Sequence, residues 1–162
     1  MTENEKRLHR CCFTGHRPEK LGRSEKAILT DLECEIRKAI QDGLSVFISG
    51  MARGIDINAA EIVLQIRQEG CPIRLICASP YPGFEDNWCE SWQTRYKFVM
   101  ANADFVKYIG SCYSKSCFQK RNEWLVNHSS RVIAVYNGTP GGTKNTIEYA
   151  LKHGIQVVHI KG

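Results

Sequence analysis

Short apolar runs alternate with amphipathic stretches along most of this chain. The apolar runs are rich in β-branched side chains and end in polar residues or glycine, which is typical of buried strands in a parallel sheet. They predict strands at residues 10–14, 44–49, 73–78, 104–109, 132–135 and 155–160. Between them, apolar positions at helical spacing predict helices over 24–42, 59–70, 84–101, 118–127 and 143–154. This alternation predicts an α/β fold with a mostly parallel central sheet of about six strands.

The composition narrows the architecture and the location of the protein. With 162 residues, of which 43% are hydrophobic, we expect one domain spanning residues 1–162. No apolar run approaches the roughly 20 residues that a membrane helix needs, and the charged N-terminal residues lack the apolar core of a signal peptide. We therefore expect a cytoplasmic protein without a membrane partner.

The chain contains eight cysteines, and their positions indicate the redox environment. Cys11, Cys12 and Cys77 lie in predicted strands and Cys34 in a predicted helix, where a free cysteine behaves as a small hydrophobic residue. This usage favours a reducing compartment. The two cysteines in the polar loop 110–117 do not have the spacing of zinc ligands, so we expect no metal site there.

Two glycine-bearing loops each follow a predicted strand and lead into a predicted helix. Their sequences are GMARGID at 50–56 and NGTPGG at 137–142. The free backbone N–H groups of a helix's first turn, with the positive end of its dipole, form an anion site, and glycine lets a phosphate approach the backbone. The expected occupant is a phosphorylated small molecule. The structural alternative for the second loop is a plain turn in which Thr143 caps the helix without any ligand.

The candidate ligand-binding residues fall into these two loops. In the first loop they are Ser49, Gly50, Met51, Ala52, Arg53, Gly54 and Asp56, and in the second they are Asn137, Gly138, Gly141, Gly142 and Thr143. For Asp56, capping of the following helix and a hydrogen bond to a ribose hydroxyl are both open. The second loop matches neither GxxxxGK[ST] nor GxGxxG, so neither standard phosphate-loop fingerprint applies.

Three further candidates, Gly15, His16 and Arg17, directly follow the first predicted strand. Open α/β sheets bind ligands at the carboxyl ends of their strands, and an arginine there can hold a phosphate with two hydrogen bonds. The alternative is that Arg17 is a solvated surface cation and His16 a turn residue. Pro80, in the stiff turn after the third strand, is placed at the same edge of the sheet.

Aromatic residues concentrate in the predicted helix 84–101. Trp88, Trp92 and Tyr96 are spaced by four, so they would share one helix face. Such a stripe is more typical of a core or of a dimer interface than of a base-stacking surface. Phe84 and Trp88, which are nearest the preceding turn, are the two aromatic residues that we place near a base.

Three motifs in order carry a resemblance to a known family. They are CCFTGHRPEKL at 11–21, FISGMARGIDINAAEIVLQ at 47–65 and GTPGGTKNTIEYA at 138–150. The second resembles the SGxARGID-type motif of DprA/Smf, and together the three resemble the YpsA-like branch of the SLOG superfamily. That superfamily joins DprA-like proteins to LOG-type phosphoribohydrolases. The resemblance covers nearly the whole chain and implies a Rossmann-like three-layer sandwich that binds nucleotides or nucleotide-derived ligands at the carboxyl ends of its strands.

The resemblance also suggests one catalytic candidate. When the LOG motif PGGxGTxxE is laid on Pro140–Gly142, it places Glu148 at the position of the catalytic glutamate. Lys144 stands where the motif has its third glycine and Asn145 where it has threonine, and both differences weaken the enzyme interpretation. A carboxylate at this position would stabilise an oxocarbenium-like centre or orient a water. The alternative is a structural residue that compensates the helix dipole.

Three functions follow from these observations. The leading hypothesis is a sensor or regulator that binds a nucleotide or a derivative such as ADP-ribose or NAD, with no required cofactor. The alternatives are a LOG-like nucleoside 5′-monophosphate phosphoribohydrolase and a DprA-like protein that binds single-stranded DNA. The net charge of +5 is spread along the chain, which favours an anionic ligand without favouring nucleic acid. Assembly into a homo-oligomer is a further expectation from the aromatic stripe.

Overall fold

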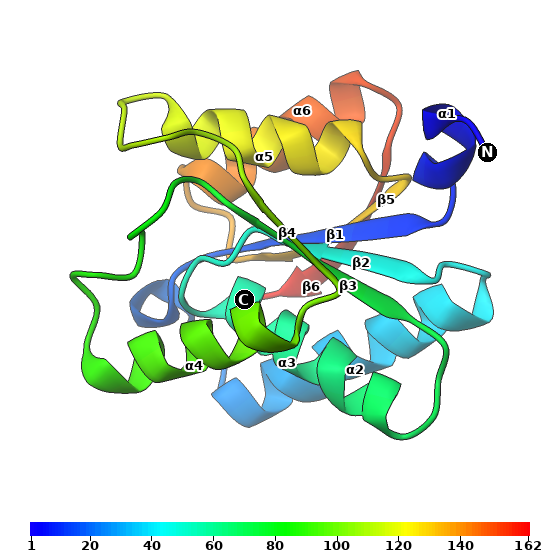
Figure 1. Ribbon diagram of the computed structural model, residues 1–162, viewed down its shortest axis with the longest axis horizontal. Helices are drawn as coiled ribbons and strands as arrows, with labels where there is room; N and C mark the ends of the chain where they lie inside the picture. Colours follow the sequence, from blue (N-terminus) through cyan, green and yellow to red (C-terminus); the bar gives the residue numbers. More distant parts are fainter.

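A six-stranded sheet lies between two layers of helices in the computed structural model, which describes residues 1–162 (Figure 1). The strands are β1 (Arg10–Gly15), β2 (Val46–Ser49), β3 (Arg74–Ser79), β4 (Phe105–Tyr108), β5 (Arg131–Tyr136) and β6 (Gln156–Lys161). Their order in the sheet is β4-β3-β2-β1-β5-β6, and every neighbouring pair is parallel. The predicted α/β fold, a Rossmann-like three-layer sandwich, is confirmed.

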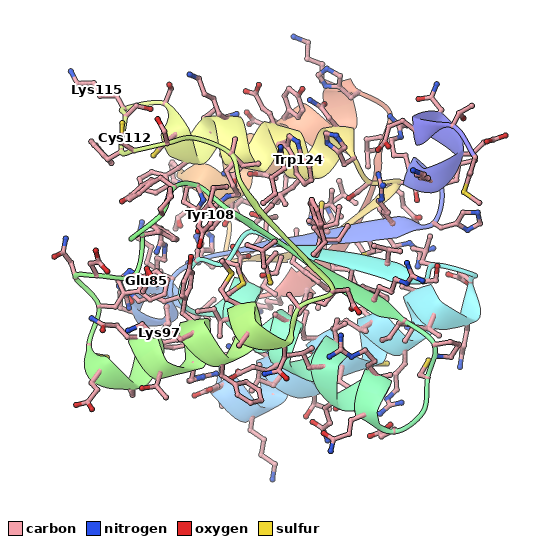
Figure 2. The ribbon with its side chains drawn as sticks, viewed as in Figure 1. Glu85, Lys97, Tyr108, Cys112, Lys115 and Trp124 are labelled. Atoms are coloured by element: carbon pink, nitrogen blue, oxygen red, sulfur yellow. The ribbon has the colours of Figure 1, made fainter.

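The helices divide unequally between the two faces of the sheet. They are α1 (Glu3–Arg7), α2 (Glu25–Gln41), α3 (Ile55–Gln68), α4 (Glu90–Asn102), α5 (Cys117–Asn127) and α6 (Gly142–Lys152), with a short 3₁₀ turn at Pro18–Lys20. Helices α2, α3 and α4 cover one face, and α5 and α6 cover the other (Figure 1). Figure 2 shows this separation at Lys97 on α4 and Trp124 on α5. None of the helices is both long and apolar enough to span a bilayer.

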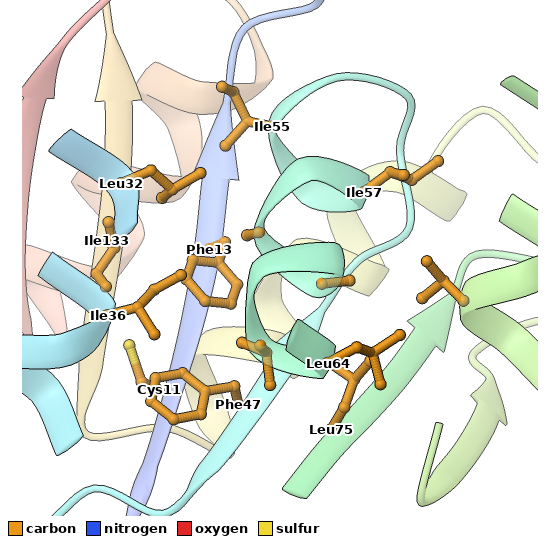
Figure 3. Packing of buried hydrophobic residues seen from close by; sticks show 14 of the residues in the cluster. Cys11, Phe13, Leu32, Ile36, Phe47, Ile55, Ile57, Leu64, Leu75 and Ile133 are labelled. Carbon is orange, nitrogen blue, oxygen red and sulfur yellow. The ribbon is translucent and has the colours of Figure 1, made fainter. Parts of the chain in front are cut away.

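The larger core lies between the sheet and α2, α3 and α4 (Figure 3). Helix α2 begins at the N-cap Ser24, whose hydroxyl accepts a hydrogen bond of 3.2 Å from the backbone N–H of Ala27. Its buried Leu32 and Ile36, one turn apart, belong to the same packed cluster as Phe13 of β1. This cluster contains 26 buried residues, against 10 on the other face, so the α2–α4 layer fixes the sheet more firmly.

The strand order reverses its direction between β1 and β5. From β1 the chain moves outward through β2, β3 and β4, and it then returns to place β5 on the other side of β1. The connections from neighbouring strands therefore leave in opposite directions at this point, which opens a crevice at the carboxyl ends of the strands. Ligands of open α/β sheets bind in this crevice.

Two sequence predictions require correction. The helix predicted from residue 84 begins at Glu90, because residues 81–87 form turns that include Gly83 at a φ of 83°. The side-chain amide of Gln93 holds these turns by donating to the carbonyls of Asp86 and Trp88, at 3.0 and 2.8 Å. Trp88 is therefore outside the helix. The second correction concerns Cys34, which is exposed because it lies on the solvent face of α2.

A substitution at Gly15, the last residue of β1, tests how closely the start of α3 packs against the sheet. A Cβ atom on Gly15 would lie 2.5 Å from Cγ1 of Ile55, the first residue of α3, so alanine at this position forces overlap. We expect Gly15→Ala to lower the free energy of unfolding by about 1–3 kcal/mol. Gly22→Ala is the control, since the nearest atom lies 4.0 Å away and the expected change is neutral or a gain of up to about 1 kcal/mol. Equal urea midpoints for the two variants would contradict this packing.

Candidate ligand-binding site

A polar cavity of about 240 Å³ lies at the point where the strand order reverses. Its lining comes from four separate segments: residues 14–17 at the end of β1 with Lys20 beyond it, Ala52 of the first glycine loop with Asp56 at the start of α3, Phe118, Arg121 and Asn122 of α5, and Gly141–Thr143 at the start of α6. The structure therefore brings the two glycine loops to one rim, as the sequence predicted. We refer to this space below as the polar cavity.

The first glycine loop is held rigid by its own polar groups. The Ser49 hydroxyl donates to the carbonyl of Asp56 at 2.8 Å and accepts from the backbone N–H of Met51 at 3.2 Å. The Asp56 Oδ2 atom accepts from the backbone N–H of Ala52 at 3.1 Å, so this carboxylate braces the loop. Met51 is buried with a φ of 63°, a left-handed conformation that costs about 1–3 kcal/mol in a non-glycine residue. Strain of this kind is concentrated at functional sites.

Arg121 forms a buried cationic wall of the polar cavity. It projects from α5 with 4% exposure, donates to the carbonyl of Gly50 and donates through Nε to Asn122 Oδ1 at 2.8 Å. A Cβ atom on Gly50 would lie 2.9 Å from its Cδ, so only glycine leaves room for this arginine. Burial lowers the pKa of Arg121 and raises the pKa of Asp56, and the opposite charge of each group counteracts both shifts.

The N-terminus of α6 contributes unpaired backbone donors. Gly141 is the N-cap, with a φ of 145°, and no side chain caps this end of the helix. The backbone N–H groups of Gly142 and Thr143 donate to no protein acceptor and line the polar cavity. Thr143 is inside the helix, which excludes the threonine cap considered as an alternative. The second loop is tied to the segment after β1 because Asn137 donates to the carbonyl of Lys20 at 2.8 Å.

His16 and Arg17 complete the wall between these loops. The His16 ring is 5% exposed and stacks on Tyr136 with centroids 5.5 Å apart, and its Nε2 atom has no hydrogen-bond partner. Burial, and then the positive charge of Lys20, lower the pKa of His16, so the ring is neutral near pH 7. Arg17 is half-buried, and its guanidinium forms no ion pair within the protein.

The remaining candidate residues lie outside the polar cavity. Arg53 turns away to an ion pair with Glu19, at 2.6 Å, and Gly54 packs beside Pro18. Glu148 is 62% exposed on α6, where its carboxylate lies 3.8 Å from Lys144 Nζ, so the catalytic candidate does not face this space. Six more of the predicted residues do not belong to the lining: Ser49, Gly50, Met51, Pro80, Asn137 and Gly138.

Three residues of α5 line the polar cavity: Phe118, which the sequence predictions omitted, and Arg121 and Asn122, which the family resemblance places near the ligand together with Gln119. Gln119 does not reach the lining. Phe118, Arg121 and Asn122 are three and four positions apart, so they share the helix face that meets the sheet. That spacing, directly after a predicted strand and loop, was the available signal. A charged residue on a helix face that also carries apolar residues is easily assigned to solvent, and only the packed fold shows that Arg121 is buried.

The fold and the position of the polar cavity define a Rossmann-like α/β protein with its site at the reversal of strand order. A family model for YpsA, described as the YspA SLOG family, matches residues 11–159, and the chain therefore belongs to this family. A UPF0398 protein of Bacillus cereus strain G9842 is 31% identical over 151 residues, covering 87% of this chain and 82% of that protein. A UPF0398 protein of strain B4264 is 33% identical over 153 residues with the same coverage.

Two solved structures share the fold. DNA processing protein A from Helicobacter pylori, described for its single-stranded DNA binding mode, has a TM-score of 0.69 at 19% identity and covers 99% of this chain and 68% of its own. DNA processing protein A (DprA) from Streptococcus pneumoniae has a TM-score of 0.68 at 20% identity and covers 96% of this chain and 51% of its own. At this identity the likeness concerns the fold.

The buried His16 predicts a specific pH dependence of stability. Its folded pKa lies below the ordinary value of 6.5, so on acidification the unfolded chain takes up the proton first and the folded state loses stability as the pH falls below about 6.5. We expect urea unfolding to show a larger loss from pH 7.5 to 5.5 in the wild type than in His16→Gln. His159→Gln, at an exposed position, should behave as the wild type. Identical pH profiles for the wild type and His16→Gln would contradict the burial of a neutral ring.

Proposed function

We propose that this protein binds a nucleotide or a nucleotide derivative, such as ADP-ribose or NAD, in the polar cavity and acts as a sensor or regulator. The observation that carries this proposal is the convergence of both glycine loops on one space at the reversal of strand order. Unpaired donors line that space from two separate segments, the start of α6 and the loop after β1. The family assignment supports the same conclusion through the superfamily resemblance described above.

The donors around the polar cavity are suited to a phosphate. The backbone N–H groups of Gly142 and Thr143 lie at the positive end of the α6 dipole, where an anion is stabilised. Arg17 has no carboxylate partner, so its guanidinium is available for two parallel hydrogen bonds to phosphate oxygens. Arg121 adds a positive charge behind these donors. No acidic residue occupies the first turn of α6.

Two further groups are suited to the hydroxyls of a sugar. His16 Nε2 is buried without a partner, and an unmet hydrogen bond of this kind is costly until a ligand supplies it. Asp56 uses Oδ2 to hold Ala52 and leaves Oδ1 without a protein donor. Because these groups line the same cavity as the phosphate donors, a phosphorylated ribose matches the chemistry better than inorganic phosphate.

The geometry favours binding over catalysis by Glu148. Hydrolysis of the N-glycosidic bond of AMP, to adenine and ribose 5-phosphate, would need a carboxylate beside C1 of the ribose. Glu148 is exposed and faces Lys144 instead. We expect no adenine release when the protein is incubated with AMP and the products are separated by chromatography. Adenine release that disappears in Glu148→Gln would make the phosphoribohydrolase the better assignment.

Binding of single-stranded DNA is the second candidate function. The shared fold with DprA proteins and the position of Arg53 beside a row of aromatic rings favour it. The charge of this chain does not gather into a basic stripe, because several arginines are paired with carboxylates, among them Arg53, Arg67 and Arg95. Oligonucleotide affinity that falls steeply with salt would support the DNA function.

The phosphate assignment is tested by thermal shift with AMP, ADP-ribose and NAD. A ligand at one hundred times its dissociation constant adds about 2.7 kcal/mol of stability, or about 5–10 °C in Tm for a chain of this size. We expect Arg17→Ala and Gly142→Asp to abolish this shift. Gly142 has a normal φ and open surroundings, so aspartate there retains the fold and repels the phosphate. Arg74→Ala, at the amino end of β3, is the control. Unchanged shifts in both site variants would place the ligand elsewhere.

A further inference from the structure

A second space adjoins the polar cavity and has a different chemical character. It has a volume of about 500 Å³ and is lined by the rings of Tyr81, Phe84, Trp88, Trp92 and Phe118, with Arg17 and Arg53 at its margin. We call it the aromatic groove. Most of its rings come from the irregular segment between β3 and α4, of which the part from residue 84 onward was predicted as helical from the sequence.

Phe84 forms the floor of the aromatic groove. It is buried, and its ring lies 5.6 Å from Tyr81, 5.0 Å from Trp88 and 5.6 Å from Phe118. These three neighbours are only partly buried and stand around the floor. Because they come from the turns after β3 and from the start of α5, the groove depends on the tertiary fold and not on one helix face.

The polar cavity and the aromatic groove adjoin each other. Arg17 and Phe118 line both spaces, so these two side chains lie at their junction. The polar cavity alone, at about 240 Å³, is smaller than the range of about 300–1,000 Å³ that small-molecule sites occupy. The two spaces together fall within that range. A ligand that fills both must be anionic at one end and flat and apolar at the other.

We propose that the aromatic groove holds the base of a nucleotide whose phosphate lies in the polar cavity. This inference rests on the proposed function and deepens it by giving the purine or pyrimidine ring of the ligand a subsite of its own, outside the polar cavity. Aromatic side chains stack on the faces of bases, and arginines at the margin add cation–π attraction. The ion pair with Glu19 turns Arg53 away from the polar cavity and holds it at the margin of the aromatic groove. In this position Arg53 would lie beside the bound base.

The inference is tested with a matched pair of ligands, AMP and ribose 5-phosphate, which differ only in the base. Of the three tryptophans, Trp88 and Trp92 line the groove. Trp124 lies on α5, on the opposite face of the sheet from α4, whose position Lys97 marks in Figure 2. In Trp124→Phe the fluorescence therefore reports on the groove alone. We expect AMP to change this emission and to bind about tenfold or more tightly than ribose 5-phosphate, which should leave the emission unchanged.

Trp88→Leu provides the complementary test. We expect this variant to lose about tenfold or more in affinity for AMP and to retain the affinity for ribose 5-phosphate, both measured by calorimetry. Phe98→Leu, at an exposed position on α4 outside the groove, is the control and should bind both ligands as the wild type does. The ligand comparison in the Trp124→Phe protein does not depend on how well Trp88→Leu folds.

The outcomes separate this inference from the proposed function. Equal affinities for AMP and ribose 5-phosphate, without a change in emission, would overturn the role of the aromatic groove and leave phosphate binding in the polar cavity intact. Absence of thermal stabilisation by AMP, ribose 5-phosphate and ADP-ribose would overturn both. Stabilisation by ADP-ribose without any change in groove emission would also reject the placement of the base.

Discussion

The site depends on one constraint, which is that β1 pairs in parallel with β2 on one side and with β5 on the other. Parallel neighbours point their carboxyl ends to the same edge, and the connections that follow β1 and β5 leave this edge in opposite directions, toward β2 and toward β6. The loops after β1, β2 and β5 are therefore forced to meet, although long stretches of sequence separate them. No residue of either glycine loop could bring about this meeting by itself.

Several polar groups are buried where these loops meet, and their burial lowers the stability of the folded protein. Asp56, Arg121 and His16 are each less than a tenth exposed, although burial shifts the pKa of all three toward the neutral form. Apolar side chains of similar size would pack there without the free-energy penalty of removing charged groups from water. The left-handed backbone of Met51 adds strain to the same loop. The proposed charged, hydroxyl-rich ligand would account for the buried His16 Nε2 and the free Asp56 Oδ1, because it would supply their missing hydrogen-bond partners.

Most of the fold was predictable from the sequence, because β-branched runs and helical periodicity reflect burial directly. All six strands were predicted, and β5, α6 and the loop between them were located within a few residues. The short helix α1 was not predicted, since it has no buried face to leave a periodic signal. The segment before α4 was assigned wrongly because Trp88, Trp92 and Tyr96 have helical spacing while Gly83 and the Gln93 side chain enforce turns.

The candidate site was predictable only in outline. The strand–loop–helix pattern located both glycine loops, yet which side chains face inward depends on tertiary contacts. Arg53 lies in a motif that resembles DprA but pairs with Glu19, whereas Arg121 lies outside the three motifs and reaches the carbonyl of Gly50. The sequence spacing of these residues carries no information about such long-range partners. The roles of the aromatic groove and of self-association remain predictions.

Hydrogen exchange at increasing concentrations of ADP-ribose tests most directly whether the two glycine loops bind one ligand. Peptides covering residues 50–56 and 139–146 report on the two loops separately, while a peptide from α2 serves as an internal reference. If the loops close on the same ligand, backbone amides in both peptides should become protected together and at the same ligand concentration, with α2 unchanged. Protection of only one loop, or equal protection throughout the chain, would contradict a shared site.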